Sequence, residues 1–238
     1  MLRVFAISLL FSLRSGCLRA QNIQSDGCKT TAKFAPAIVT NPFATVTFEC
    51  TRATPLDLIR ATGRQTRIPI GLVLGLDPSA LEKPQRSYDL VGMTAQNALT
   101  EALRDTGYSL REEDGVHVLR AGDLTPSQEN YLYLHYTNFQ SSGTMAEMAA
   151  DLTGWMWTAT HLASGYGGSI LGSTNDERFT LEEMQSATTE EIANKIVSQG
   201  SKGMWILRTA PSDTHDPSDY QVEVEHYQHY SNRPNVEF

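Results

Sequence analysis

The side chains best suited to hold a metal ion lie near the C-terminus of this 238-residue chain. His226 and His229 are three positions apart in an expected strand, where they would point to opposite faces and could not share one ion. The segment 211–219 gathers further candidate ligands: Asp213, His215, Asp216 and Asp219. Oxygen-rich loops bind calcium, but this one lacks EF-hand spacing, and turn formation explains its Asp, Ser and Pro residues better. We therefore expect neither a metal nor a cofactor.

A glycine-rich segment and a group of acidic residues raise the question of catalysis. Residues 164–172 (SGYGGSILG) lack the Gly-Lys-Ser/Thr ending of a phosphate-binding loop, and Leu171 stands where a nucleophile elbow needs its second glycine. Four acids could supply the carboxylate pair of a glycosidase: Glu182, Glu183, Glu190 and Glu191. However, Glu190 and Glu191 fall in the first turn of an expected helix, where acids on a solvated face complement the helix dipole. No Ser-His-Asp set follows from spacing, although triads can converge from distant positions, so we expect a protein that is not an enzyme.

Aromatic residues offer a binding function instead. Trp155 and Trp157 are two positions apart in an expected strand, which places both rings on one face. Together with Tyr166 in the following loop they could form a platform for a glycan or another envelope ligand. Two aromatic residues at this spacing are more often part of a core. Ligand binding through an aromatic face is therefore the alternative to the function expected below.

The overall composition narrows the class of protein. A chain of 238 residues with 40% hydrophobic residues can bury a core and form one large or two small domains. Its formal net charge is −8, whereas a duplex binder needs a basic face to neutralise phosphates. Nucleic acid is therefore not an expected partner.

Residues 1–20 have the layout of a secretory signal peptide, with an apolar run over 4–13 and a small-residue cleavage site ending at Ala20. The run is too short to span a bilayer, which needs about 20 apolar residues. An alternative is a lipid anchor at Cys17, although Arg14 stands where a lipoprotein signal has an aliphatic residue. A buried core helix is a further alternative. We expect an exported mature chain with no transmembrane segment.

Cleavage after Ala20 would leave two cysteines, Cys28 and Cys50. In an oxidising compartment two such cysteines usually form a disulfide with each other. Closing this loop would stabilise the fold by about 3 kcal/mol on the chain-entropy estimate. It would attach the arm 21–44 to the first expected strand, 45–50. Two free thiols, or a bond to another chain, remain the alternatives.

Hydrophobic periodicity predicts the same order of elements twice: strand, helix, strand, strand, helix, strand, strand. The first copy comprises a strand at 45–50, a helix at 53–67, strands at 68–75 and 86–93 separated by a loop at 76–85, a helix between Thr94 and Gly107, and a hairpin of 108–113 and 116–121 around Asp114-Gly115. The second copy comprises a strand at 130–139, a helix at 141–154, strands at 155–163 and 178–184, a helix at 186–200, and strands at 202–210 and 220–230. The pattern predicts an α+β fold with an internal duplication.

The first copy resembles the secretin and TonB N-terminal short domain, the STN family. The resemblance covers about a third of the chain. The matching positions are Pro55-Leu56, Gln65-Thr66, Leu90, Thr94, Ala98, Leu99, Leu103, Gly107, Tyr108 and the run DGVHVL at 114–119. It implies a small α+β domain of two helices packed with small mixed sheets in the Gram-negative periplasm. Such a domain sits at the front of a secretin channel or a TonB-dependent receptor. Nothing downstream has the length of a barrel or a secretin ring, so we expect a free-standing form.

The expected organisation is a signal peptide (1–20), an N-terminal arm (21–44), an STN-like domain (45–122), a second STN-like domain (130–230) and a tail (231–238). The expected function is a non-enzymatic periplasmic adaptor, or accessory factor, with an association to the outer membrane as a further option. Its partner would be an envelope protein: a secretin, a TonB-dependent receptor or a regulator. Exposed strand edges would bind that partner through main-chain hydrogen bonds.

Overall fold

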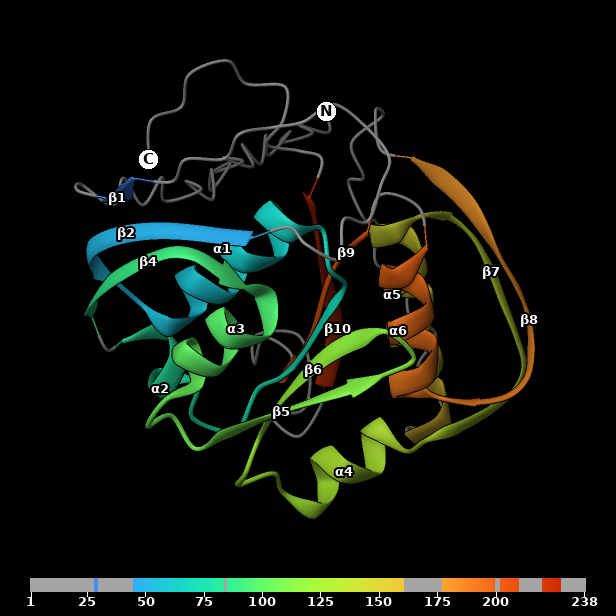
Figure 1. Ribbon diagram of the computed structural model, residues 1–238. Coiled ribbons are helices and arrows are strands. Elements are labelled where there is room, and N and C mark those ends of the chain that lie inside the picture. The colour runs from blue at the N-terminus through green and yellow to red at the C-terminus, as the bar shows by residue number, and fades with distance from the viewer. Residues whose placement is uncertain are drawn as a thin grey trace, which may run out of the picture.

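The computed structural model describes residues 28–29, 45–83, 85–160, 177–199, 202–209 and 220–227. Within them the chain folds into the predicted mixture of helices and mixed sheets, an α+β fold (Figure 1). Several predictions fall outside these ranges: the signal peptide 1–20 with Cys17, the glycine-rich segment with Tyr166, the loop 211–219, His229 and the tail 231–238.

The strands in chain order are β1 (Cys28–Lys29), β2 (Thr45–Ala53), β3 (Ile70–Val73), β4 (Arg86–Thr94), β5 (Tyr108–Glu113), β6 (Val116–Ala121), β7 (His135–Thr144), β8 (Arg178–Thr188), β9 (Gly203–Thr209) and β10 (Tyr220–His226). The helices are α1 (Pro55–Thr66), α2 (Ser79–Glu82), α3 (Ala95–Leu103), α4 (Pro126–Leu132), α5 (Met145–Thr160) and α6 (Thr189–Ser198).

β3 is the middle strand of a five-stranded sheet with the order β10-β9-β3-β6-β5. It pairs in parallel with β6 on one side and β9 on the other, while β5–β6 and β9–β10 are antiparallel. The sheet therefore combines strands from 45–122 with strands from 130–230. The expectation that each half builds its own sheets is wrong here, because β3 has two pairing edges and each half occupies one. The boundary between two domains stays a prediction.

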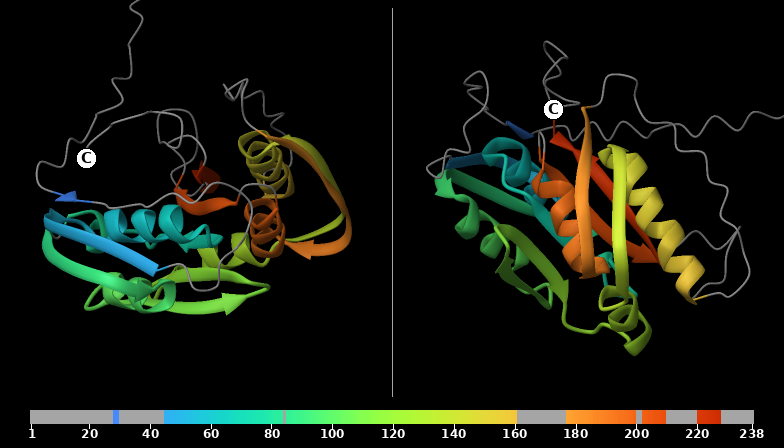
Figure 2. Two further views of the ribbon diagram at one scale, coloured as in Figure 1. Left: turned by 45° about the horizontal axis from the view of Figure 1, so that its top comes forward. Right: turned by 90° about the vertical axis from the view of Figure 1, so that its right-hand side faces the viewer.

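Each face of this sheet carries a pair of helices and an outer ribbon of strands (Figure 2). On one face α1 and α3 lie beneath β2 and β4, and on the other α5 and α6 lie beneath the long antiparallel pair β7–β8. Successive strand residues point to opposite faces, so Leu72 joins the core of the first face and Val73 that of the second. The two faces thus carry the same kinds of element, and the internal duplication stays a prediction.

The prediction of a single strand at 130–139 is wrong, because this segment contains the end of α4 and the start of β7. Thr125 and Gln128 form a capping box, with Gln128 N donating to Thr125 Oγ1 at 3.2 Å and Thr125 N to Gln128 Oε1 at 3.0 Å. Pro126 occupies the first helical position, where its missing N–H costs nothing. These signals begin α4. The alternation of aromatic and apolar residues at 130–139 predicted a strand for the last residues of this helix.

The strand predicted at 155–163 is also wrong, since α5 continues through Thr160. Leu152 and Met156 lie four positions apart and are both fully buried, which is the spacing of a helix face. Two smaller differences concern the first half: the predicted loop 76–85 contains α2, and α3 ends at Leu103. Gly107 therefore lies in the turn before β5 rather than at the helix end.

Candidate functional site

The two edges of the five-stranded sheet differ. At the β10 edge, α5 side chains bind the outward-facing backbone: Val222 N donates to Thr153 Oγ1 at 3.0 Å. Thr153 Oγ1 lies 3.4 Å from the Val222 carbonyl oxygen, and Trp157 Nε1 donates to the Tyr220 carbonyl oxygen at 2.7 Å. A partner strand would have to displace these contacts. This edge is closed by its own helix.

The opposite edge is β5, the first strand of a tight hairpin. The two turn residues, Asp114 and Gly115, have φ values of 51° and 77°, as a type I′ turn requires, and the strand pair begins at Glu113↔Val116. The predicted hairpin is confirmed. In such a hairpin alternate residues form hydrogen-bonded pairs with the partner strand, and those between them direct their backbone groups outward.

The register identifies which β5 backbone groups face outward. Gly122 N donates to the Gly107 carbonyl oxygen at 3.1 Å, so hydrogen-bonded pairs fall at odd positions of this strand. The outward positions are therefore Tyr108, Leu110 and Glu112. Tyr108 N donates to Thr106 Oγ1 at 3.3 Å. In the described part of the chain no strand pairs with the outer side of β5, which leaves the Leu110 and Glu112 N–H groups facing outward.

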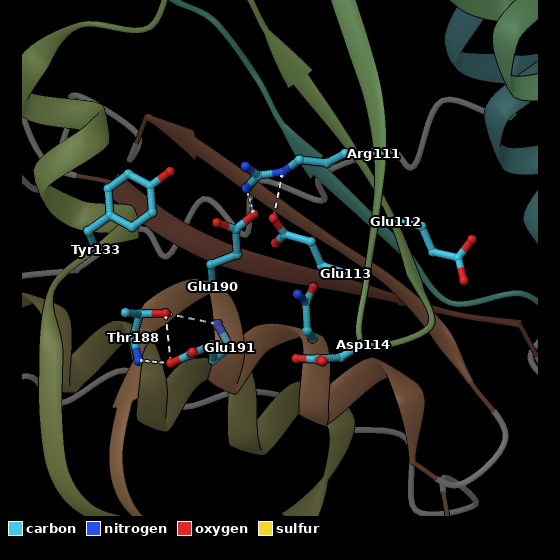
Figure 3. A pocket seen from close by; sticks show the side chains of 9 residues that line it. Arg111, Glu112, Glu113, Asp114, Tyr133, Thr188, Glu190 and Glu191 are labelled. Atoms are coloured by element: carbon cyan, nitrogen blue, oxygen red, sulfur yellow. Dashed lines mark hydrogen bonds and ion pairs between the residues drawn. The ribbon is translucent and has the colours of Figure 1, made fainter.

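A groove of about 570 Å³ lies beside this edge (Figure 3). It is formed by the hairpin tip, the residue after α4 and the start of α6. Its lining residues are Arg111, Glu112, Glu113, Asp114, Tyr133, Thr188, Glu190, Glu191 and Asn194. Arg111 and Glu113 reach it because odd positions of β5 point to the α6 face of the sheet, like Val116 and Val118 opposite them.

An ion pair joins the edge strand to α6. Arg111 Nη2 lies 2.6 Å from Glu190 Oε1, and Arg111 Nε lies 3.0 Å from Glu113 Oε1. Burial, the largest effect, would lower the pKa of Arg111, but the hydrogen bond to Glu190 and the negative charges of Glu190 and Glu113 together outweigh it, and the pKa is raised. Burial and then the negative charge of Glu190 raise the pKa of Glu113. The groove thus has a local excess of negative charge despite Arg111.

Glu190 is almost fully buried, with 5% of its side chain exposed. It lies in the first turn of α6, as predicted, but the predicted solvated face is wrong for it because Arg111 covers it. Glu191 is exposed and closes a capping box, accepting from Thr188 N at 2.7 Å. The two neighbouring acids therefore serve different purposes: one ties β5 to α6, and the other begins the helix.

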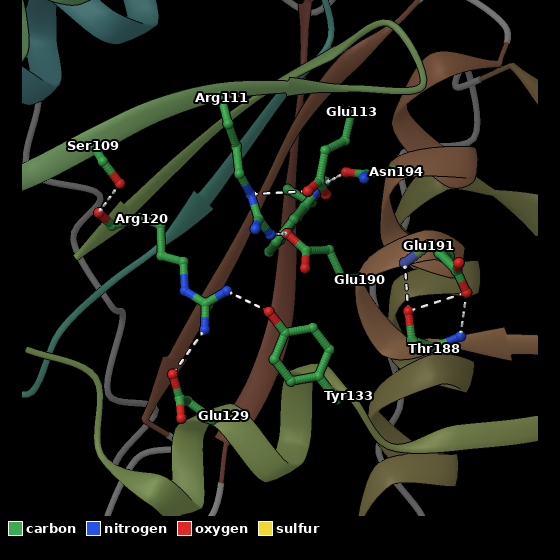
Figure 4. A network of polar contacts seen from close by, with 11 residues as sticks. Ser109, Arg111, Glu113, Arg120, Glu129, Tyr133, Thr188, Glu190, Glu191 and Asn194 are labelled. Atoms are coloured by element: carbon green, nitrogen blue, oxygen red, sulfur yellow. Dashed lines mark hydrogen bonds and ion pairs between the residues drawn. The ribbon is translucent and has the colours of Figure 1, made fainter. Parts of the chain in front are cut away.

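Tyr133 is an aromatic side chain held in an exposed position on the groove, with 46% of its surface accessible. Arg120 Nη1 donates to its hydroxyl at 2.6 Å, and the Arg120 guanidinium lies 5.4 Å from the ring centroid (Figure 4). Glu129 holds the other end of that guanidinium at 3.1 Å. An aromatic ring fixed in this way loses little conformational entropy on binding and suits an interface anchor.

The predicted aromatic platform does not have the predicted geometry. Trp155 and Trp157 lie in α5, where residues two apart point in nearly opposite directions. Trp155 is 48% exposed and contacts the rings of Tyr136 and Phe139 edge-on. Trp157 is buried against β10. The prediction that both tryptophan rings share one face of a strand is therefore wrong.

The cysteine prediction falls on β1 and β2. Cys50 is disulfide-bonded, and its Cα partner in the antiparallel register is Cys28. The register agrees with the predicted pairing of these two residues, which stays a prediction.

Sequence reasoning did not identify Arg111, Tyr133 or the β5 edge as a site. The alternation of the run YSLREE shows that Arg111 and Glu113 share a face. The contact of Arg111 with Glu190 joins residues 79 positions apart, and no local signal in one sequence reports it.

No protein-family model, curated protein or solved structure gives a significant match to this chain. The resemblance to the STN family thus depends on the residues quoted above. Among the helices of the described segments, none has both the length and the hydropathy needed to cross a bilayer. Over the same segments, no three His, Cys, Asp or Glu side chains are placed to share a metal ion.

Proposed function

We propose that this protein is a non-enzymatic interaction module that binds an extended segment of a partner protein as an added strand on β5. The observation that carries the proposal is the difference between the sheet edges. Thr153 and Trp157 close the β10 edge, whereas the β5 backbone at Leu110 and Glu112 faces outward beside a groove. Exposed edges are a liability in soluble proteins, and a protein that closes one edge and leaves the other open is arranged for pairing there.

The edge is well prepared for a partner strand. Tyr108 and Leu110 pack their side chains against the core on the α3 side, and the Tyr108 hydroxyl accepts a hydrogen bond from Gly75 N at 3.2 Å. Arg111 fixes the other face to α6. β5 is thus held in extended form before binding, so little ordering entropy is lost when a partner arrives. Each main-chain hydrogen bond formed would contribute about 0.5–1.5 kcal/mol net.

The signal-peptide pattern and the STN resemblance support a periplasmic location and an envelope partner. On that basis the protein is an adaptor or accessory factor of an assembly of the secretin or TonB-dependent transport or signalling type. The partner is a secretin, a receptor or a regulator that exposes an extended segment.

Replacing Glu112 with proline tests the proposal most simply. Glu112 is exposed, and its outward N–H makes no contact with β6, so proline removes the donor without breaking the hairpin. Glu112→Ala is the matched control, because it loses the same carboxylate and keeps the N–H. A photo-crosslinking residue at the exposed Ser109 would report the partner in intact cells, and one at Gln96 on α3 gives the background.

We expect one dominant envelope protein crosslinked at 109, through a segment that mass spectrometry maps to one short stretch. Glu112→Pro should lower that yield about tenfold or more, because one hydrogen bond is lost and the ring blocks the partner's carbonyl. Glu112→Ala should retain most of it. Equal yields from the proline and alanine variants, or equal crosslinking from positions 96 and 109, would remove the basis for strand addition.

A further inference from the structure

The groove beside β5 continues into a second one of about 560 Å³, with which it shares Asp114, Glu191 and Asn194. We call the two together the acidic groove. Its carboxylates are Glu113, Asp114, Glu182, Glu183, Glu190 and Glu191, whereas the Glu112 side chain points away from the groove (Figure 3). Its basic side chains are Arg111 and Lys195, and Arg111 is already paired with Glu113 and Glu190.

Glu190 contributes a buried carboxylate oxygen that can accept a further hydrogen bond. Its side chain is 5% exposed, and in the described part of the chain only Oε1 is paired, with Arg111. Figure 3 shows the second oxygen on the Tyr133 side of the groove. A carboxylate oxygen with little access to water gains strongly from a hydrogen bond to a cationic donor.

The alternation of side chains along an added strand determines which of them would meet this negative charge. Every second side chain of a strand added to β5 would point to the α6 face, beside Arg111 and Glu113. Those side chains would enter the acidic groove, whereas the alternate ones would lie on the α3 side. The two sets of positions therefore meet different environments.

We propose that the segment bound on β5 is basic, with lysine or arginine at alternate positions directed into the acidic groove. This proposal rests on the proposed strand addition and adds the chemistry of the partner. The carboxylates are spread along the hairpin tip, β8 and α6, so a line of separate cations matches them better than a single ion. Burial and, after it, the negative charge of Glu190 raise the pKa of Glu113, and an added cation nearby would offset both effects by stabilising the ionised carboxylate.

Two peptides of equal length test the proposal on the full chain. One alternates threonine with lysine, and the other alternates threonine with serine, so that only the first carries cationic side chains. Binding is measured by fluorescence anisotropy at low salt and at about 0.5 M salt. Isosteric substitutions at exposed groove residues reduce the charge: Asp114→Asn, Glu182→Gln and Glu183→Gln together. The matched control removes three exposed charges elsewhere: Glu49→Gln, Glu82→Gln and Asp89→Asn.

We expect the lysine peptide to bind at least about tenfold more tightly than the serine peptide at low salt, and the difference to shrink at high salt. The groove triple variant should lose most of that preference, and the control triple should keep it. Equal affinity for both peptides, or equal loss in the two triple variants, overturns the basic segment.

The Glu112 variants separate this failure from failure of the proposed function. If both peptides bind equally and Glu112→Pro weakens both relative to Glu112→Ala, strand addition holds and only the charge preference is wrong. If the lysine peptide binds the proline and alanine variants equally, or neither peptide binds, strand addition itself fails, and the basic segment fails with it.

Discussion

The Arg111–Glu190 ion pair is expected to hold the edge strand against α6, and its removal gives a measurable loss of stability. Breaking a fully buried pair by removing one partner costs about 3–5 kcal/mol. Here 35% of the Arg111 side chain is exposed against 5% of Glu190, and Arg111 keeps Glu113 at 3.0 Å. Solvent screening and the remaining partner reduce the expected cost of Glu190→Gln to about 1–2 kcal/mol.

A double-mutant cycle isolates this interaction. Urea unfolding at 25 °C would be followed for the full chain, Glu190→Gln, Arg111→Met and the double variant. The loss of the Arg111–Glu113 contact is common to Arg111→Met and the double variant and cancels in the cycle. The double variant removes both partners of the Arg111–Glu190 pair, so it should be more stable than the sum of the single losses predicts, by about 1 kcal/mol. Losses that add within about 0.5 kcal/mol would refute the interpretation that this pair joins β5 to α6 energetically.

Three further predictions concern the framework around the site. Burial lowers the pKa of His117 below 6.5, so the folded state resists protonation of this side chain. The free energy of unfolding should therefore fall as pH drops from 6.5 toward that lower pKa, by at most about 1.4 kcal/mol per pH unit. Unfolding curves of His117→Gln between about pH 7.5 and 5.5 should lack this part of the pH dependence. Trp157→Phe removes the donor to the Tyr220 carbonyl and should cost about 1–3 kcal/mol in urea unfolding. No loss would show that this hydrogen bond does not stabilise the β10 edge. Gly71→Ala would place a Cβ 2.6 Å from the Trp205 ring and should cost about 1–3 kcal/mol, measured by the same method, with an unchanged midpoint as the contrary result.

Short sequence motifs predicted the helix starts and the turn that are set by hydrogen bonds and backbone conformation within a few residues. Thr94 accepts from Asn97 N and begins α3, and Asp114-Gly115 adopts the left-handed φ values of the hairpin turn. The β5 edge and one wall of its groove come from this region. The elements that carry the candidate site were therefore largely predictable, although their role was not.

Competing patterns explain the errors. Alternating aromatic residues at 130–139 outweighed the Thr125–Gln128 capping box, and two tryptophans outweighed the helical spacing of Leu152 and Met156. Tertiary pairing accounts for the rest. The sheet shared through β3, the closure of β10 by α5 and the contact of Arg111 with Glu190 join distant segments, and periodicity in one sequence does not report which segments meet.

Amide hydrogen exchange along β5 tests the central claim most directly. In the free protein we predict fast exchange at Leu110 and Glu112 and slow exchange at Ser109, Arg111 and Glu113, which face β6. Adding the lysine peptide should slow exchange at Leu110 and Glu112 and leave the other three nearly unchanged. Slow exchange at all five in the free protein, or peptide binding without protection at Leu110 and Glu112, would contradict an open edge that binds a partner strand.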